Sequence, residues 1–93
     1  MFKIITTKYF NKKLFKLIKN NFYLEDKVSS AIDTLLQDPL DPKLKSHKVQ
    51  NLYSSRVTGD IRIIWQYNPD NNNEIQILEL LDIGGHSGGN RVY

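Results

Sequence analysis

Residues 43–93 of the 93-residue chain hold basic, histidine and tyrosine side chains that could act together on a phosphate group. The set comprises Lys43, Lys45, His47, Lys48, Arg56, Arg62, His86, Arg91 and Tyr93. Histidine moves protons near neutral pH, and arginine presents two parallel donors to phosphate oxygens. Metal-free RNA cleavage needs a base for the 2′-hydroxyl proton, an acid for the leaving 5′-oxygen and cations for the phosphate. The set fits this chemistry.

The sequence contains little evidence for other common kinds of catalytic site. The chain has no cysteine, which excludes disulfides, thiolate metal sites and cysteine nucleophiles, and fits a reducing compartment. It contains neither a P-loop nor a dinucleotide-binding glycine motif. The two histidines lack metal-ligand spacing, and the acidic residues after position 50 are typical of turns and strand surfaces. We therefore expect neither a metal nor another cofactor.

Positive charge is concentrated in the first half of the chain. Residues 1–50 carry ten lysines and five acidic residues, whereas residues 51–93 carry three arginines and five acidic residues. A basic half favours a polyanionic partner, either nucleic acid or an acidic protein surface. A lysine-rich face that only keeps the protein in solution is the alternative.

The sequence also bears on membranes and on domain number. No apolar run reaches the roughly 18 residues that span a bilayer, and lysines interrupt any signal-peptide core. We therefore expect a soluble, cytoplasmic protein with one domain, residues 1–93. A basic amphipathic helix over residues 8–22 that acts on membranes is an alternative. A second helix and a sheet that bury the same apolar face argue against it.

Two amphipathic helices are predicted in the first half. Apolar residues recur at helical spacing over residues 8–20 and again over residues 24–37. Residues 2–5 form a short apolar strand before Thr6-Thr7, whose hydroxyl groups can cap the first helix. Asp38-Pro39 ends the second helix. The two helices form a hairpin whose apolar faces need a further layer to cover them.

That further layer is predicted to be a sheet. Residues 49–53 and 55–58 are short strand candidates, residues 61–67 form the strongest strand, and residues 75–83 form the next. The predicted order is β-α-α-β-β-β. The fold class is therefore α+β, with a small, mainly antiparallel sheet packed against an N-terminal helical hairpin.

The turn before the strongest strand decides whether two arginines share a face. If Thr58-Gly59-Asp60 is a three-residue loop, Arg56 lies opposite Arg62, and two adjacent cations imply an anion between them. If the loop is only Gly59-Asp60, the two arginines point to opposite faces. Alternation along residues 61–67 leaves Arg62 on the open face, away from the helices. An ion pair with Glu79 or Asp82 is the structural alternative for Arg62.

Two stretches resemble the RelE/ParE toxin superfamily. Residues 43–67, "KLKSHKVQNLYSSRVTGDIRIIWQY", are similar to its central hairpin. There, a basic loop leads to a strand, an arginine-containing strand, a Gly-Asp type turn and an "(Y/I)RI(I/V)(W/Y)" strand. Residues 80–93, "LLDIGGHSGGNRVY", are similar to the "IGxH…VY" close of RelE-like and YafQ-like members. With the two N-terminal helices, the resemblance covers essentially the whole chain.

The resemblance implies a toxin of a type II toxin–antitoxin system that enters the ribosomal A site and cuts mRNA without a metal, by 2′-hydroxyl attack. The catalytic residues that it implies are His86, Arg62, His47 and Tyr93. The implied RNA-binding residues are Lys43, Lys45, Lys48, Arg56 and Arg91. The implied partners are the ribosome with its mRNA and a cognate antitoxin, whose acidic helical segment forms a hetero-oligomer with the toxin.

The chain departs from the family pattern in two places. Six residues separate His86 from Tyr93, three more than usual, and Asn51 stands where relatives often have glycine. The superfamily also suggests an alternative function, because ParE-like members share the fold and inhibit DNA gyrase without cutting RNA. His86 and the terminal tyrosine favour the nuclease, since an inhibitor that only binds gyrase needs no proton-transfer residue.

Overall fold

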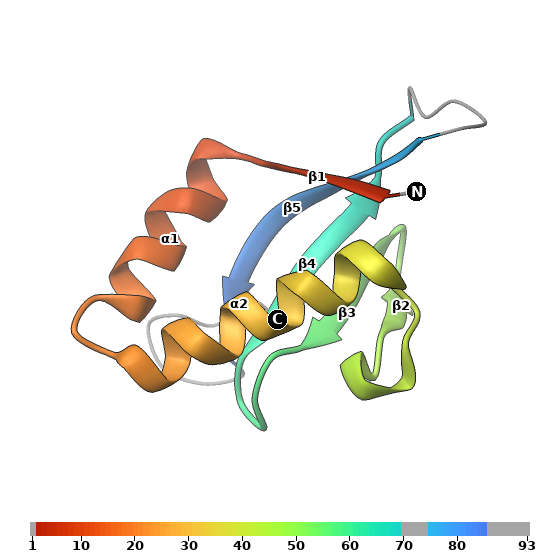
Figure 1. Ribbon diagram of the computed structural model, residues 1–93. Helices are drawn as coiled ribbons and strands as arrows, with labels where there is room; N and C mark the ends of the chain where they lie inside the picture. The colour runs from red at the N-terminus through yellow and green to blue at the C-terminus, as the bar shows by residue number, and fades with distance from the viewer. Residues whose placement is uncertain (1, 70–74, 86–93) are drawn as a thin grey trace.

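The computed structural model describes residues 2–69 and 75–85 (Figure 1). In chain order the elements are β1 (Phe2–Thr6), α1 (Lys8–Ile18), α2 (Phe22–Gln37), the short 3-10 helix η1 (Pro42–Leu44), β2 (His47–Val49), β3 (Leu52–Arg56), β4 (Arg62–Tyr67) and β5 (Gln76–Gly84). The α+β class and the predicted order are confirmed. Four strands follow the helices, as many as the candidate segments and one more than the written order, and the first two have shifted bounds.

Both helices begin at a side-chain cap. The Thr7 hydroxyl accepts a hydrogen bond from the Phe10 amide at 3.0 Å, and the Asn21 side chain accepts one from the Leu24 amide at 3.1 Å. These bonds satisfy amide groups that have no partner within the helix. Asn20, with a φ of 58°, separates the two helices in the left-handed conformation that asparagine tolerates. The predicted helices are thus present, the second beginning two residues earlier than expected.

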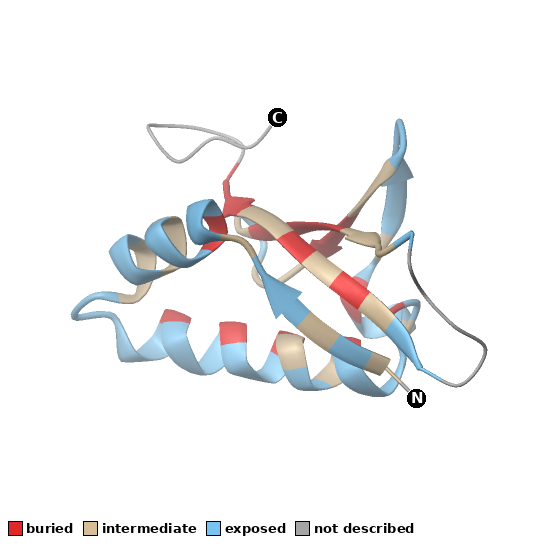
Figure 2. Cartoon of the chain, turned by 90° about the horizontal axis from the view of Figure 1, so that it is seen from above, coloured by how far each residue is buried: buried red, intermediate tan, exposed pale blue. Residues whose placement is uncertain are grey.

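The sheet has five strands in the order β1-β5-β4-β3-β2. Strand β1 runs parallel to β5, and the other neighbours are antiparallel. Both helices cover one face of this sheet, and the buried positions of α2 lie along the side that faces it (Figure 2). The opposite face carries no helix in the described part of the chain (Figure 1). Within residues 2–69 and 75–85 the architecture is therefore two layers, and we call the sheet face without a helix the uncovered face.

The core lies between the helices and the sheet. Ile63 and Trp65 of β4 are fully buried in it, whereas Ile64, between them, faces the other side. This alternation follows from the two-residue period of a strand. Full burial of one large apolar side chain contributes about 1.5–3 kcal/mol. The expectation that the Ile63 and Trp65 side of β4 packs under the helices is confirmed, and Arg62 consequently lies on the face away from them.

The boundary between β2 and β3 differs from the sequence prediction. A single strand was predicted over residues 49–53, but the chain turns at Gln50 and Asn51, and β3 begins at Leu52. Gln50 has a φ of 58°, and it is this residue rather than Asn51 that takes the left-handed conformation. Two-residue hairpin loops require positive φ at a central position. Glutamine is rarely found in such a turn, so the turn could not be predicted from the sequence.

No helix among residues 2–69 and 75–85 is both long and apolar enough to cross a membrane.

Candidate functional site

The hairpin between β3 and β4 places two arginines on one sheet face. Arg56 lies opposite Arg62, and the Val57 amide donates to the Ile61 carbonyl over 2.8 Å. The loop is therefore the three-residue one, Thr58-Gly59-Asp60. Residues directly opposite in an antiparallel pair share a face. Of the two turns considered from the sequence, the one that brings the arginines together is confirmed.

The guanidinium of Arg62 lies across β3 rather than pointing into solvent. Its Nε donates to the hydroxyl of Ser54, which is itself fully buried. Its Nη2 donates to the Lys45 carbonyl at 2.9 Å and to the Ser54 carbonyl at 3.0 Å. Only 9% of the residue is exposed. Arg62 thus lies on the sheet face expected from the alternation, but it is buried there, because the small side chain of Ser54 lets the guanidinium lie flat against the neighbouring strand.

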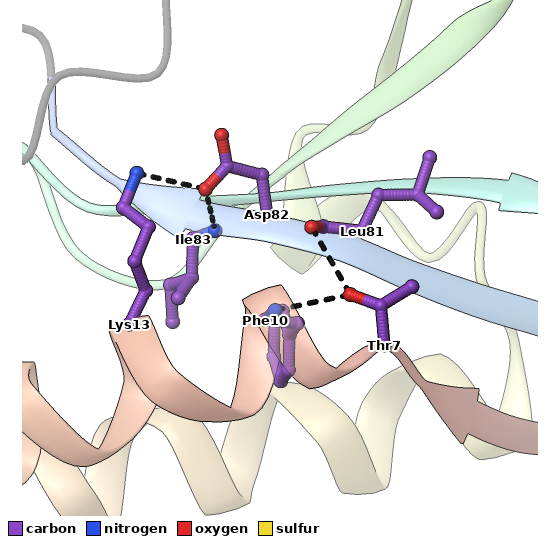
Figure 3. Close-up of polar contacts among 6 residues, drawn as sticks. All are labelled: Thr7, Phe10, Lys13, Leu81, Asp82 and Ile83. Carbon is purple, nitrogen blue, oxygen red and sulfur yellow. Dashed lines mark hydrogen bonds and ion pairs between the residues drawn. The ribbon is translucent and has the colours of Figure 1, made fainter.

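The carboxylates considered as partners for Arg62 are engaged elsewhere. Asp82 forms an ion pair with Lys13 at 2.8 Å, which joins α1 to β5 (Figure 3). Glu79 accepts a hydrogen bond from the Asn68 side chain at 3.0 Å. Arg62 is therefore held by carbonyl and hydroxyl oxygens, and its positive charge has no ion-pair partner in the described part of the chain.

Arg62 also contacts His47, from β2. Its Nη2 lies 3.3 Å from Nδ1 of the imidazole. Arginine can only donate, so Nδ1 accepts, and the neutral ring carries its proton on Nε2. His47 is exposed. A buried arginine therefore fixes which nitrogen of an exposed histidine presents a proton to solvent.

The second terminal nitrogen of Arg62, Nη1, is available to a ligand. It has no hydrogen-bond acceptor among the described residues. Since no buried side-chain nitrogen or oxygen in that part of the chain lacks a partner, Nη1 must reach solvent. The uncovered sheet face therefore presents a cationic donor, Nη1 of Arg62, beside a neutral donor, Nε2 of His47.

A chain of hydrogen bonds holds the loop that carries His47. Trp65 Nε1 donates to the Ser55 hydroxyl at 2.7 Å, and the Ser46 hydroxyl donates to the Pro39 carbonyl at 2.9 Å. The two hydroxyl oxygens are 2.6 Å apart. Because the Ser46 hydrogen is already used, Ser55 must be the donor between them. The bonds thus run in one direction from the buried indole to the loop, which fixes the residue before His47.

The end of β5 lies beside the same arginine. Gly84 is opposite Arg62 in the sheet register. The carboxylate of Asp60 lies so close to Gly85 that a Cβ there would approach its Oδ2 to 2.6 Å. Gly85 therefore allows the turn before β4 to approach the end of β5. His86, Arg91 and Tyr93 lie outside the described residues.

Several solved toxins have the same fold. A metal-bound toxin from Helicobacter pylori is 28% identical, with a TM-score of 0.71 over 92% of this chain and 96% of that one. A YoeB/ParE toxin from Agrobacterium tumefaciens is 17% identical, with a TM-score of 0.72 over 91% and 99%. YafQ from E. coli is 19% identical, with a TM-score of 0.69 over 91% and 93%, and is also known in a DinJ-YafQ toxin-antitoxin complex. No protein-family model and no curated protein matches the chain.

The chain has the fold of the RelE/YafQ-like toxin superfamily. The resemblance inferred from residues 43–67 and 80–93 is thereby confirmed.

The remaining basic candidates of this RelE/YafQ-like chain are spread over two sides. Lys43 lies in η1, and Lys45, in the left-handed conformation with a φ of 46°, leads from η1 towards β2. Lys48 alternates with His47 along β2 and so belongs to the opposite face. Arg56 turns towards its own hairpin loop, where its Nε donates to the Thr58 carbonyl at 3.3 Å. The structure thus brings Arg62 and His47 together, and it does not add Lys48 to them.

Two serines that position the Arg62–His47 contact were not predicted from the sequence. Ser54 and Ser55 occupy the middle of β3, one beneath the Arg62 guanidinium and the other on the Trp65 indole. The available clue was a pair of small polar residues within a strand that is otherwise aromatic and apolar. Among the described residues, no three histidine, aspartate or glutamate side chains gather as a metal ion would require.

Proposed function

We propose that this chain is the toxin of a type II toxin–antitoxin system and that it cleaves ribosome-bound mRNA. The observation that carries the proposal is the Arg62–His47 contact, which sets a cationic and a neutral donor side by side on an uncovered sheet face. The RelE/YafQ-like fold supports it, as does the known DinJ-YafQ toxin-antitoxin complex for an antitoxin partner. The basic first half suits both a ribosome and an acidic helical antitoxin segment.

In the proposed reaction the 2′-oxygen attacks the adjacent phosphorus, and the bond from phosphorus to the 5′-oxygen breaks. The products are a 2′,3′-cyclic phosphate and a free 5′-hydroxyl. The phosphate gains negative charge in the transition state, and fixed donors stabilise such charge strongly because they need no reorganisation. Nη1 of Arg62 and Nε2 of His47 supply these donors to the non-bridging oxygens.

The tautomer of His47 limits its role in this reaction. Its free lone pair would be on Nδ1, and that lone pair accepts the Arg62 hydrogen bond. While the contact persists, His47 cannot take the 2′-hydroxyl proton, and it acts as a hydrogen-bond donor. We assign the proton transfers to His86, the histidine implied by the family resemblance, and stacking on the substrate to Tyr93. The reaction as proposed requires no metal.

The experiment uses programmed ribosomes and a matched pair of mRNAs. One mRNA is all ribose, and the other carries a single 2′-deoxynucleotide on the 5′ side of the cut. We expect the first to yield a 2′,3′-cyclic phosphate and a 5′-hydroxyl, and the second to remain intact at that position because its nucleophile is missing. A 2′-deoxynucleotide placed three positions away is the control and should not prevent cleavage.

Two outcomes would overturn the proposal. Cleavage of the 2′-deoxy mRNA, or products with a 5′-phosphate, would show that water or a metal-bound hydroxide is the nucleophile. Intact mRNA together with inhibited supercoiling by DNA gyrase would show that the chain acts as a gyrase inhibitor.

A further inference from the structure

A second concentration of positive charge lies away from the Arg62–His47 contact. A cavity of about 170 Å³ opens between α2, η1 and the end of β3. Three cationic residues line it, Lys27 from α2, Lys43 from η1 and Arg56 from β3. We call it the three-cation cavity. The family resemblance gave no role to Lys27.

The three cations have no carboxylate partner in the described part of the chain. The ion pair found there joins Lys13 and Asp82, which are not at the cavity. Lys27 is held instead by the ring of Tyr23, whose centroid lies 5.5 Å from its Nζ. The nearby Asp41 uses its Oδ1 to accept from the Lys43 amide at 2.8 Å. Like charges that line one small cavity repel each other unless an anion lies between them.

The walls of the cavity suit an anion that accepts hydrogen bonds. Ser30 and Thr34 line it from α2 and are one helical turn apart. Thr34 already donates its hydroxyl hydrogen to the Ser30 carbonyl at 3.0 Å, which leaves the Ser30 hydroxyl as the neutral donor. Leu44, which also lines the cavity, is 2% exposed and belongs to the hydrophobic core. Polar and cationic residues thus line most of the cavity. Such a lining suits one compact anionic group better than apolar side chains.

We propose that the three-cation cavity binds one phosphate of the RNA strand, away from the phosphate that is cut. The identity of the strand rests on the proposed function. Arg56 lies opposite Arg62 in the sheet, and Lys43 is two residues before Lys45, whose carbonyl holds Arg62. A strand that leaves the cut site can therefore reach the cavity around the edge of β3. An acidic protein segment fits less well, because it would also need apolar surface for its other side chains.

The first experiment asks whether the cavity binds phosphate at all. Inorganic phosphate is titrated against chloride at constant ionic strength, and amide NMR shifts are recorded. We expect saturable shifts at Leu44, Val57 and Thr34 in the wild type, and their loss in Lys27→Gln. Lys3→Gln on β1, at the opposite edge of the sheet, makes the same charge change and should leave the shifts unaltered. Shifts that are absent, or that persist in Lys27→Gln, overturn the proposal.

The second experiment asks whether the phosphate belongs to RNA. A single-stranded RNA with 2′-O-methyl groups throughout binds without being cut, and its affinity is measured from low to high salt. Losing one phosphate contact lowers the slope of log affinity against log salt by about 0.7 for a single strand, which is about 5-fold in affinity at 0.1 M salt. We expect this loss for Lys27→Gln and no change for Lys3→Gln.

The two experiments separate this proposal from the proposed function. If Lys27→Gln abolishes phosphate binding but RNA affinity is unchanged, the RNA assignment is overturned, and a glutamate-rich peptide becomes the expected ligand. If Lys27→Gln weakens both phosphate and RNA binding while the wild type cuts no mRNA, the nuclease proposal fails and the three-cation cavity is upheld.

Discussion

Nη2 of Arg62 lies 3.3 Å from Nδ1 of His47, and this contact makes the imidazole an acceptor towards the protein and a donor towards solvent. The same nitrogen also donates to the backbone carbonyls of Lys45 and Ser54, so its two hydrogens serve three acceptors and one of them is shared. The arginine thereby fixes the loop as well as the ring. One buried side chain thus sets both the position and the chemical character of an exposed histidine.

Replacing His47 tests whether it donates a hydrogen bond or transfers a proton. In His47→Gln the amide still offers an N–H group, so we expect mRNA cleavage to fall by only about 10-fold. In His47→Ala the donor is gone, and loss of one such donor lowers the rate by about 100-fold or more. The measurement is the single-turnover rate on programmed ribosomes.

Stability serves as the control for these two variants. His47 is exposed, so both should unfold within about 0.5 kcal/mol of the wild type. Equal inactivity of the glutamine and alanine variants would contradict the donor role and would indicate that His47 transfers a proton.

Arg62 should contribute to stability as well as to activity. Arg62→Ala leaves the Lys45 and Ser54 carbonyls and the Ser54 hydroxyl without their donor. We expect it to lose about 3 kcal/mol in the free energy of unfolding, measured by urea denaturation. Arg56→Ala, whose Nε–carbonyl contact is 3.3 Å, is the control and should lose less than about 1 kcal/mol. Equal losses would contradict the anchoring role.

The hydrogen bonds from Trp65 through Ser55 to Ser46 predict which serine contributes more to stability. Ser55→Ala leaves the buried Trp65 Nε1–H without an acceptor, which costs about 2 kcal/mol of unfolding free energy. Ser46→Ala removes the acceptor of the Ser55 hydroxyl and the donor to the Pro39 carbonyl, and it should cost less because Ser46 is only partly buried and water can replace these bonds. Thermal unfolding of both variants measures the order. A larger loss for Ser46→Ala would show that the direction of the chain is wrong.

Tyr67 should make the fold sensitive to alkali. Burial, with smaller contributions from Tyr53 and Asp38, raises the pKa of the Tyr67 phenol above its ordinary 10.0. The folded state therefore resists ionisation more than the unfolded state does. Stability is unaffected below pH 10 and falls as the pH rises through 10 towards the raised pKa. Tyr67→Phe should match the wild type at pH 7 and resist alkaline unfolding better, as denaturant titration at each pH will show. Equal alkaline sensitivity would contradict this.

The helices and the central strand were predictable because their side chains have one strong period. Phe10 belongs to the helical period of apolar residues in α1, and Leu35 belongs to that of α2. Ile63 and Trp65 lie two positions apart on one face of β4. In each case burial of the apolar face fixes the element. Local spacing also gave the two possible β3–β4 loops, although only the tertiary register chose between them.

The state of Arg62 could not be predicted in the same way. Its burial depends on Ser54, eight positions away on the neighbouring strand, and on a carbonyl seventeen positions away at Lys45. No periodic pattern links these residues, and a serine in a strand does not predict that an arginine side chain will lie over it. The contact with His47 similarly depends on a turn at Gln50, which is not a typical turn residue.

The protonation of the His47 ring tests the account most directly. Long-range ¹H–¹⁵N NMR at alkaline pH, where imidazoles are neutral, distinguishes a protonated Nε2 from a protonated Nδ1. The Arg62 contact predicts that His47 is protonated on Nε2 in the wild type, and that Arg62→Lys, which lacks the planar fork, gives a mixture of the two forms. A wild-type ring protonated on Nδ1 would contradict the account, because that hydrogen would point at the guanidinium.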